Sequence, residues 1–417
     1  MELKPSNLSF NLNTGIFLKI ILLLSLLGSI LNLQTISILF IYLFFVLSLF
    51  KKKRSLEFYK YVIPLIGMTF LGLIFSYSNI LKDVLRDFFY FTTPILLIIF
   101  GIICTVHLTL NKFVLLITYF GLFYSIYYVV SFILLSFQDT YGLDEMRGLI
   151  GPGNIISILS FYFLITNIAK DKYTKILILR ILFILLNSLA IFLFNSRSYF
   201  ICFIIFLFFF FQTFPLRIKF ALIIFSILVI VLLTTININS DNSFYGKALN
   251  SFNEISINNG AELSENISNY RAFETLAAID TYLTGNSLNY IIGQGFGKLI
   301  DLKIEIQLTT ESWQFIPLVH NGYMYILVKT GILGILFFFI FLINIYPSKQ
   351  LQRIPQKHLY LRVILKSLII SCLLTNFVIN GFFNLEMQFL LICLGAFFNY
   401  LKIETQSFTQ LKLNNGL

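Results

Sequence analysis

The chain has 417 residues, of which 58% are hydrophobic and 17% aromatic, while only 12% carry a charge. An ordinary soluble domain is about a quarter charged, so this composition excludes a soluble protein, and apolar runs without strand-like alternation argue against a transmembrane barrel. The net charge of +11 does not indicate nucleic-acid binding, because the basic residues gather in short loops on one side of the predicted membrane spans.

Apolar runs of bilayer-crossing length recur along the whole chain, since a spanning helix needs roughly 20 apolar residues. We therefore predict an all-α polytopic membrane protein with about twelve transmembrane helices. The expected spans are residues 16–33, 35–50, 61–78, 88–106, 113–136, 149–168, 175–194, 198–212, 216–236, 319–346, 360–379 and 383–401. The first run lacks a small-residue cleavage site, which indicates a retained helix rather than a signal peptide.

Short loops rich in lysine and arginine all fall on the same side of these spans. They are residues 51–60, 170–175, 215–219 and 347–362. Because basic loops remain on the cytoplasmic side of a membrane, we place this side and both termini in the cytoplasm.

The longest connection falls on the other side. Residues 237–318 hold nine acidic and four basic residues, and loops much beyond about 15 residues are usually functional or disordered. This large extracytoplasmic loop divides the chain. Residues 1–236 form an N-terminal part with about nine helices, and residues 319–417 form a C-terminal part with about three helices and a cytoplasmic tail.

The middle of this outer loop has the pattern of an ordered helix. In residues 269–285, apolar side chains recur on one helical face at Ala272, Leu276, Ile279 and Leu283. Ser268 or Asn269 can cap the start of this helix, and Gly285 lies just past its end. Residues 289–299 are then expected to form a glycine-rich turn. This turn is not a phosphate-binding fingerprint, because no βαβ pattern surrounds it.

Arginines on the outer side are the first candidate site residues. They are Arg86, Arg147, Arg197 and Arg271. Arg197 lies in a hairpin with almost no loop, so it sits at the outer surface as an interfacial anchor or as an anion ligand. Arg147 precedes the Gly-Pro-Gly break at 151–153, where it can line an opening together with Asn154.

The other two arginines have local acidic partners. Arg271 opens the loop helix and either pairs with Glu274 at i+3 or binds a ligand. Arg86 lies between Asp83 and Asp87, and local charge pairing is the better interpretation. Arginines that converge on one outer pocket would suit a diphosphate, because the guanidinium fork matches phosphate oxygens two at a time.

His320 begins the tenth predicted span and faces outward. A neutral imidazole readily accepts a proton near neutral pH, so beside arginines that hold a diphosphate it suits a general base of glycosyl transfer. The alternative is a histidine that only caps or packs at the helix start. Lys329, on the same apolar helix, either snorkels to the outer interface or faces a polar cavity, where Gly331 and Gly334 let a neighbouring helix approach closely.

No metal-binding motif is visible. The four cysteines, Cys104, Cys202, Cys372 and Cys393, lie in apolar runs and are interpreted as small hydrophobic residues. No acidic metal cluster of the D-x-D or H-E-x-x-H kind is present in the sequence, so arginine rather than a divalent ion would meet the charge of a leaving diphosphate.

Together these residues resemble the O-antigen ligase and O-antigen polymerase superfamily of bacterial envelope glycan assembly. The resemblance covers about residues 140–400 and rests on the order of several short motifs and a large outer loop. These motifs are an Arg-Gly segment followed by asparagine (Arg147, Gly148, Asn154), a Ser-Arg-Ser hairpin (196–198), an arginine helix leading to Gly-x-Gly-x-Gly (Arg271; Gly293, Gly295, Gly297), and His-Asn followed by Gly-x-x-Gly (His320, Asn321, Gly331, Gly334).

The resemblance implies a GT-C-like membrane fold in the bacterial cytoplasmic membrane, with no metal ion and no cofactor. The implied donor is a glycan on undecaprenyl diphosphate at the outer face. Carried over to this sequence, Arg147, Arg197 and Arg271 bind the donor diphosphate, and His320 is the catalytic base for the acceptor hydroxyl. Supporting residues are Asn154, Asn321, Lys329 and Arg86.

The resemblance leaves the acceptor open. A polymerase accepts another lipid-linked repeat unit of O-antigen, capsular polysaccharide or exopolysaccharide, and a chain-length regulator would be its partner. A ligase accepts lipid A-core or a protein. We favour the polymerase.

Other classes fit the sequence less well. A flippase or transporter would show inverted repeats and charges near the mid-membrane, but no repeat is visible and the charges cluster on the outer side. A peptidoglycan polymerase of the cell-shape or division type would show a carboxylate-centred pattern. A scaffold protein would not need an ordered outer loop.

Overall fold

The computed structural model describes residues 20–24, 28, 33–49, 60–137, 143–151, 153–166, 168, 173, 175–194, 196–211, 219, 270–308, 311–347 and 359–414. Nearly all regular structure in these residues is helical. The N-terminal helices are α2 (Gln34–Leu49), α3 (Ile63–Ile74), α4 (Leu81–His107), α5 (Leu110–Ser136), α6 (Leu143–Ile150), α7 (Ile155–Ile165), α8 (Leu177–Leu193) and α9 (Arg197–Phe211). The later elements are α13 (Tyr270–Leu283), α14 (Ser287–Ile292), β1 (Ile300–Leu308), β2 (Glu311–Ile316), α15 (Gly322–Ile345), α16 (Leu359–Ile379), the 3-10 helix η4 (Leu385–Met387) and α17 (Gln388–Asn414).

Most predicted spans coincide with a described helix. Five helical stretches are long and apolar enough to cross a membrane: Leu81–His107, Leu110–Ser136, Gly322–Ile345, Leu359–Ile379 and Leu385–Ser407. Shorter apolar helices are α3, α7, α8 and most of α9. The predicted spans 16–33 and 216–236 lie largely outside the described residues. The chain is thus a helical, multi-pass membrane protein, while the count of about twelve spans stays a prediction.

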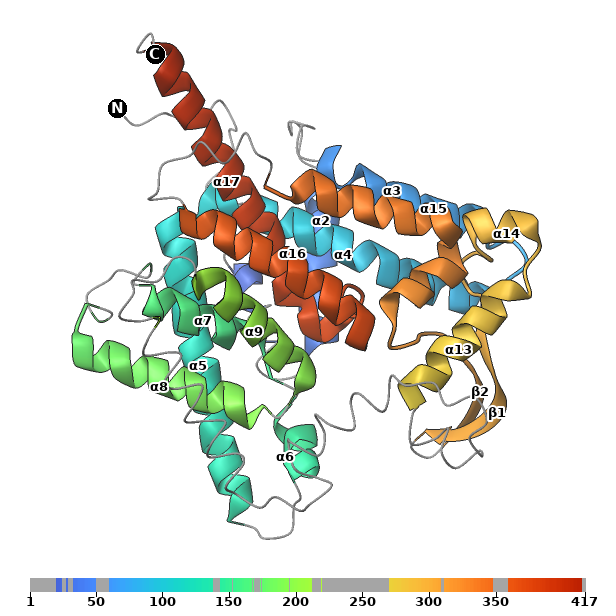
Figure 1. Ribbon diagram of the computed structural model, residues 1–417, viewed down its shortest axis with the longest axis horizontal. Helices are drawn as coiled ribbons and strands as arrows, with labels where there is room; N and C mark the ends of the chain where they lie inside the picture. Colours follow the sequence, from blue (N-terminus) through green and yellow to red (C-terminus); the bar gives the residue numbers. More distant parts are fainter. Residues whose placement is uncertain are drawn as a thin grey trace.

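Two groups of helices flank α16 and α17 in Figure 1. In one group α5 packs on α7 and α8, and in the other α15 packs on α3. Helix α17 packs along α4, where glycine allows the two backbones to touch. A Cβ added at Gly101 would lie 2.0 Å from the carbonyl oxygen of Ile392, and one added at Gly395 would lie 2.1 Å from that of Ile98.

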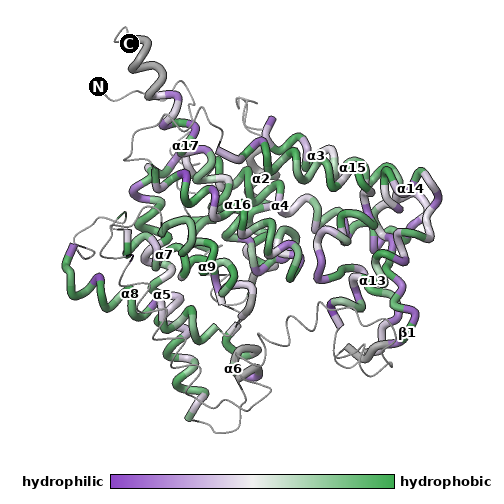
Figure 2. The backbone as a smooth tube through the Cα atoms, viewed as in Figure 1, coloured by the Kyte–Doolittle hydropathy of each residue, from purple (hydrophilic) through white to green (hydrophobic). Residues whose placement is uncertain are grey.

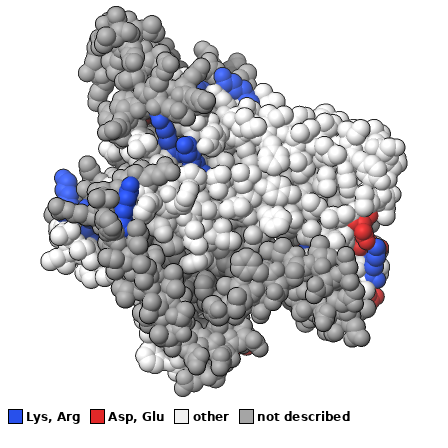
Figure 3. Space-filling model, viewed as in Figure 1, with Lys and Arg blue, Asp and Glu red and all other residues white. Residues whose placement is uncertain are grey.

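Charge is distributed unevenly over the molecule. The helical bundle is mostly apolar in Figure 2, and the polar residues gather towards its ends. Lysine and arginine appear at the upper and left parts of the face in Figure 3, and acidic side chains appear at the right, around α13 and the hairpin β1–β2, with a basic side chain among them. The predicted orientation, with the basic end in the cytoplasm, stays a prediction.

The antiparallel hairpin β1–β2 was not among the elements predicted from the sequence. The strands pair Ile300 with Ile316 and Asp301 with Phe315, and the register shifts between Asp301 and Ile306. The alternation of apolar and polar residues in Asp-Leu-Lys-Ile-Glu-Ile, residues 301–306, is a strand signal that could have revealed it.

Helix α13 confirms the predicted loop helix but not its predicted apolar face. Leu276 is 38% exposed and Leu283 is 56% exposed. The buried residues are Glu274, Ala277, Ala278, Thr281 and Tyr282. The prediction of the face was wrong because α13 packs against both β1 and α15, so the side of the helix that carries Glu274, Ala278 and Tyr282 is buried instead.

Helix α15 is broken at Gly331, whose backbone has φ 65° and ψ −166°. The prediction of one continuous helix after His320 was therefore wrong. A Cβ added at Gly331 would lie 2.4 Å from the carbonyl oxygen of Ile291. The glycine therefore lets the α14 segment approach, rather than another membrane-spanning helix.

Candidate functional site

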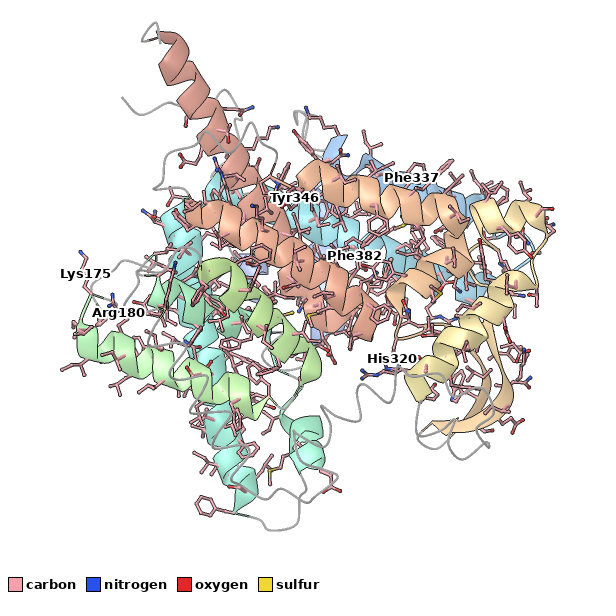
Figure 4. All side chains as sticks on the ribbon, viewed as in Figure 1. Lys175, Arg180, His320, Phe337, Tyr346 and Phe382 are labelled. Carbon is pink, nitrogen blue, oxygen red and sulfur yellow. The ribbon has the colours of Figure 1, made fainter. Side chains whose placement is uncertain are left out.

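His320 lies just before α15 and against α13 (Figure 4). Its ring Nδ1 lies 2.7 Å from Glu274 Oε2, and its backbone N–H donates to the same oxygen at 3.0 Å. The Glu274 side chain is 3% exposed, whereas the His320 side chain is 45% exposed. Helix α13 therefore presents a buried carboxylate to an accessible imidazole.

This contact determines which ring nitrogen of His320 can act as a base. A carboxylate only accepts hydrogen bonds, so the proton of the neutral imidazole lies on Nδ1 and the lone pair on Nε2. A base whose other nitrogen is oriented by a third group is the usual arrangement in proton-transfer catalysis. This role of Glu274 was not predicted from the sequence, because the spacing of Glu274 from Arg271 suggested a local ion pair.

Tyr270 lies beside the dyad formed by His320 and Glu274. Its ring lies edge-on to the imidazole, with the ring centroids 6.2 Å apart. Burial, and then the nearby Glu274 carboxylate, raise the pKa of the Tyr270 phenol. Tyr270 therefore stays neutral beside the dyad and adds no negative charge to it.

Lys329 does not reach the interface, as one of its predicted alternatives required. Its side chain is fully buried, and Nζ donates to Asp87 Oδ2 at 2.6 Å. The other oxygen of Asp87 accepts a hydrogen bond from the Tyr325 hydroxyl at 2.8 Å. The signal that could have found this pair is that two opposite charges lie in or beside separate apolar runs, where unpaired charge is costly.

The glycine-rich turn after α14 closes the break in α15. Its backbone N–H groups at Gln294 and Gly295 donate to the carbonyl oxygens of Val328 and Lys329, at 2.8 and 3.1 Å. Gly297 N–H donates to Asp87 Oδ2 at 2.7 Å, and Lys329 Nζ also donates to the Lys298 carbonyl. The turn therefore satisfies backbone groups that a broken helix would leave unpaired.

Arg86 forms the local pair that the sequence predicted. Its Nη2 lies 2.8 Å from Asp83 Oδ1, one turn earlier on α4. Asn154 and Asn321 act as helix caps: Asn154 Oδ1 accepts from Ile156 N–H at 3.0 Å, and Asn321 Oδ1 accepts from Tyr323 N–H at 3.1 Å. These contacts give Arg86, Asn154 and Asn321 a structural role, and their part in substrate binding stays a prediction.

The arginines predicted to bind the donor lie on three different helices. Arg147 is part of α6, Arg197 is the first residue of α9, and Arg271 is the second residue of α13. The side chains of Arg147 and Arg197 lie outside the described residues. Arg271 is half-buried and lies on α13 with Glu274, and its part in donor binding stays a prediction.

The turn between α16 and α17 contacts both the start of α9, which carries Arg197, and the start of α15, which follows His320. At one end Tyr199, near the start of α9, donates from its hydroxyl to the Glu386 carbonyl at 3.4 Å. At the other end a Cβ added at Gly322, two residues after His320, would lie 2.4 Å from Asn380 Oδ1. The start of α9 and the start of α15 therefore share one neighbour, which is the α16–α17 turn.

Among the residues that the structure describes, no group of three or more histidine, cysteine or acidic side chains could hold a metal ion. The four cysteines are free and buried, as expected for small hydrophobic residues. Whether the chemistry needs a metal stays a prediction from the family resemblance.

Comparison with known proteins identifies one family. A family model described as O-antigen ligase matches residues 182–339, from within α8 to within α15. No curated protein matches the chain. The match includes Arg197, Arg271, Glu274 and His320, so the superfamily indicated by the sequence motifs is confirmed over this part of the chain.

Proposed function

We propose that this chain, which belongs to the O-antigen ligase and polymerase superfamily through residues 182–339, transfers a glycan from an undecaprenyl diphosphate carrier to a sugar hydroxyl. The reaction would take place at the outer face of the bacterial cytoplasmic membrane. The observation that carries the proposal is the accessible His320 imidazole held by the buried Glu274 carboxylate at 2.7 Å. This dyad suits a proton acceptor for an attacking hydroxyl.

In the proposed reaction His320 Nε2 removes the proton of the acceptor hydroxyl as its oxygen attacks the anomeric carbon of the donor. A new bond forms between this oxygen and the anomeric carbon, while the bond from the anomeric carbon to the diphosphate oxygen breaks. The carrier leaves as its diphosphate, whose negative charge is met by Arg147, Arg197 and Arg271. The imidazolium then loses its proton to water.

We favour polymerisation, in which the acceptor is a second lipid-linked repeat unit and a chain-length regulator is a partner. The second candidate is a ligase that transfers finished polymer to lipid A-core or to a protein. One observation favours the ligase, because the matching family model is described as O-antigen ligase. The two activities differ in acceptor and not in the bond chemistry at His320.

The test compares surface glycan of the native host carrying His320→Ala or Arg197→Ala with that of the wild type. General-base catalysis typically contributes about 10²–10⁴-fold to a rate, so long glycan should be lost at normal membrane levels of the protein. Loss of long polymer with single repeat units still on the acceptor identifies a polymerase. Loss of all transferred glycan, with polymer retained on the lipid carrier, identifies a ligase.

Matched controls separate the site from general effects on the protein. His107→Ala, in the last turn of α4, and Arg180→Ala, in the first turn of α8, remove the same side chains at the predicted cytoplasmic end. Both should leave the glycan unchanged. An unaltered glycan in His320→Ala would show that this histidine is not the base.

A further inference from the structure

The hairpin β1–β2 has one face that no described element covers. Its other face packs on α13, where Ile300, Leu302 and Ile316 are buried. On the uncovered face Trp313 is 40% exposed and Phe315 is 47% exposed. Because side chains alternate between the faces of a strand, both rings point away from α13.

Polar groups accompany the two rings. Asp301 is the cross-strand partner of Phe315, so both side chains share the uncovered face. Asp301 Oδ1 accepts hydrogen bonds from Gln314 Nε2 at 3.1 Å and from Lys303 N–H at 2.8 Å. Lys303 has φ 61° in the irregular part of β1 and pairs with Asp280 of α13. Irregularities of this kind often re-aim side chains next to functional sites.

We propose that this face is a binding platform for the glycan chain. The flat faces of indole and phenyl rings pack against the apolar C–H face of a sugar ring, and a fixed carboxylate accepts hydrogen bonds from neighbouring hydroxyls. The inference rests on the proposed function and extends it, because β2 ends four residues before His320. A glycan engaged at His320 therefore has a second binding surface on the strand that leads to it.

The charged groups on and beside this face favour a glycan over the lipid bilayer. Aromatic rings also gather at membrane interfaces, but the carboxylate of Asp301 would be costly among acyl chains, as would the exposed Lys303–Asp280 pair beside the face. These charged groups are compatible with a hydrated sugar ligand. Lipid contact is the alternative that the experiment must detect.

Trp313 provides a direct readout, because it is the single tryptophan of the chain. The full-length protein in lipid nanodiscs is titrated with oligosaccharide released from the host's own surface polysaccharide, and intrinsic fluorescence is recorded. We expect a saturable change. Phe315→Ala and Asp301→Asn should each weaken binding about tenfold, the scale of one lost packing or hydrogen-bonding contact of about 1.4 kcal/mol. Phe137→Ala, at another exposed ring, should leave binding unchanged.

A parallel measurement uses nanodiscs made with brominated lipids. Strong quenching of Trp313 by these lipids, without any response to the oligosaccharide, would overturn the platform in favour of membrane contact. No response to either probe would also overturn it.

His320→Ala separates the platform from the proposed function. This variant should bind the oligosaccharide like the wild type while losing transfer activity. Full activity of His320→Ala, with oligosaccharide binding retained, would reject the proposed base and leave the platform standing. Loss of activity in His320→Ala without any oligosaccharide response in the wild type would reject the platform alone.

Discussion

One carboxylate oxygen of Glu274 accepts hydrogen bonds from both the ring and the backbone of His320. It therefore fixes the tautomer of the imidazole and the position of the loop at once. A glutamine at this position has the same shape, but its amide can donate to Nδ1 and stabilise the tautomer with the proton on Nε2. That tautomer has no lone pair facing the acceptor.

Glu274→Gln should consequently lower the maximal transfer rate by at least about tenfold, with a smaller change in donor KM. The measurement is transfer by purified protein with the host's lipid-linked donor at saturating concentration. Asp280→Asn is the matched control, since it makes the same carboxylate-to-amide change at an exposed site of the same helix. Equal rates for both variants and the wild type would remove Glu274 from the mechanism.

The Lys329–Asp87 pair joins three elements, because Asp87 lies on α4, Lys329 on α15, and both contact the glycine-rich turn through Gly297 and Lys298. Removing one partner of a buried pair leaves an uncompensated charge, which costs about 3–5 kcal/mol. We expect Lys329→Met to lower the unfolding temperature strongly. The double variant Lys329→Met with Asp87→Asn should have a higher unfolding temperature than Lys329→Met alone.

Thermal unfolding of the purified variants in detergent measures this effect. The exposed pair Lys303–Asp280 supplies the control, because exposed ion pairs contribute little to stability. Lys303→Met should therefore unfold close to the wild type. A wild-type unfolding temperature for Lys329→Met would show that the buried pair does not hold the turn in place.

Gly295 occupies a position of the glycine motif that requires glycine. It has φ 80°, a conformation that strains other residues, and an added Cβ would lie 2.1 Å from the Phe75 carbonyl oxygen. Gly295→Ala should lose both folded protein and activity, because a backbone atom cannot move aside as a flexible side chain can.

The control is Gly67→Ala in the interior of α3. An added Cβ there would meet only the Phe337 ring, at 3.3 Å, and alanine favours a helix over glycine by about 1 kcal/mol. This variant should be recovered in wild-type yield after detergent extraction. Similar yields for both variants, measured by size-exclusion chromatography, would contradict the role given to Gly295.

The described helices could be predicted from the sequence because lipid forces each spanning segment to satisfy its own backbone hydrogen bonds. Hydropathy therefore located the long apolar helices, whereas the short helices α6 and α14 gave no such signal. The pairs that build the site could not be predicted, because spacing carries no information about contacts such as Glu274 with His320, separated by 46 residues, or Asp87 with Lys329, separated by 242. The break in α15 was missed because Gly331 also fits a continuous helix that packs closely.

The same hydropathy and charge pattern predicts the orientation of the whole molecule, with α13 outside and the start of α8 in the cytoplasm. Cysteine labelling can test this because the four native cysteines are buried. Leu283→Cys and Tyr173→Cys are matched reporters, with parent residues 56% and 52% exposed. A membrane-impermeant maleimide should label Leu283→Cys in spheroplasts, and Tyr173→Cys only after the membrane is permeabilised. Labelling of Tyr173→Cys before permeabilisation would invert the orientation and put His320 on the side opposite to an outer-face donor.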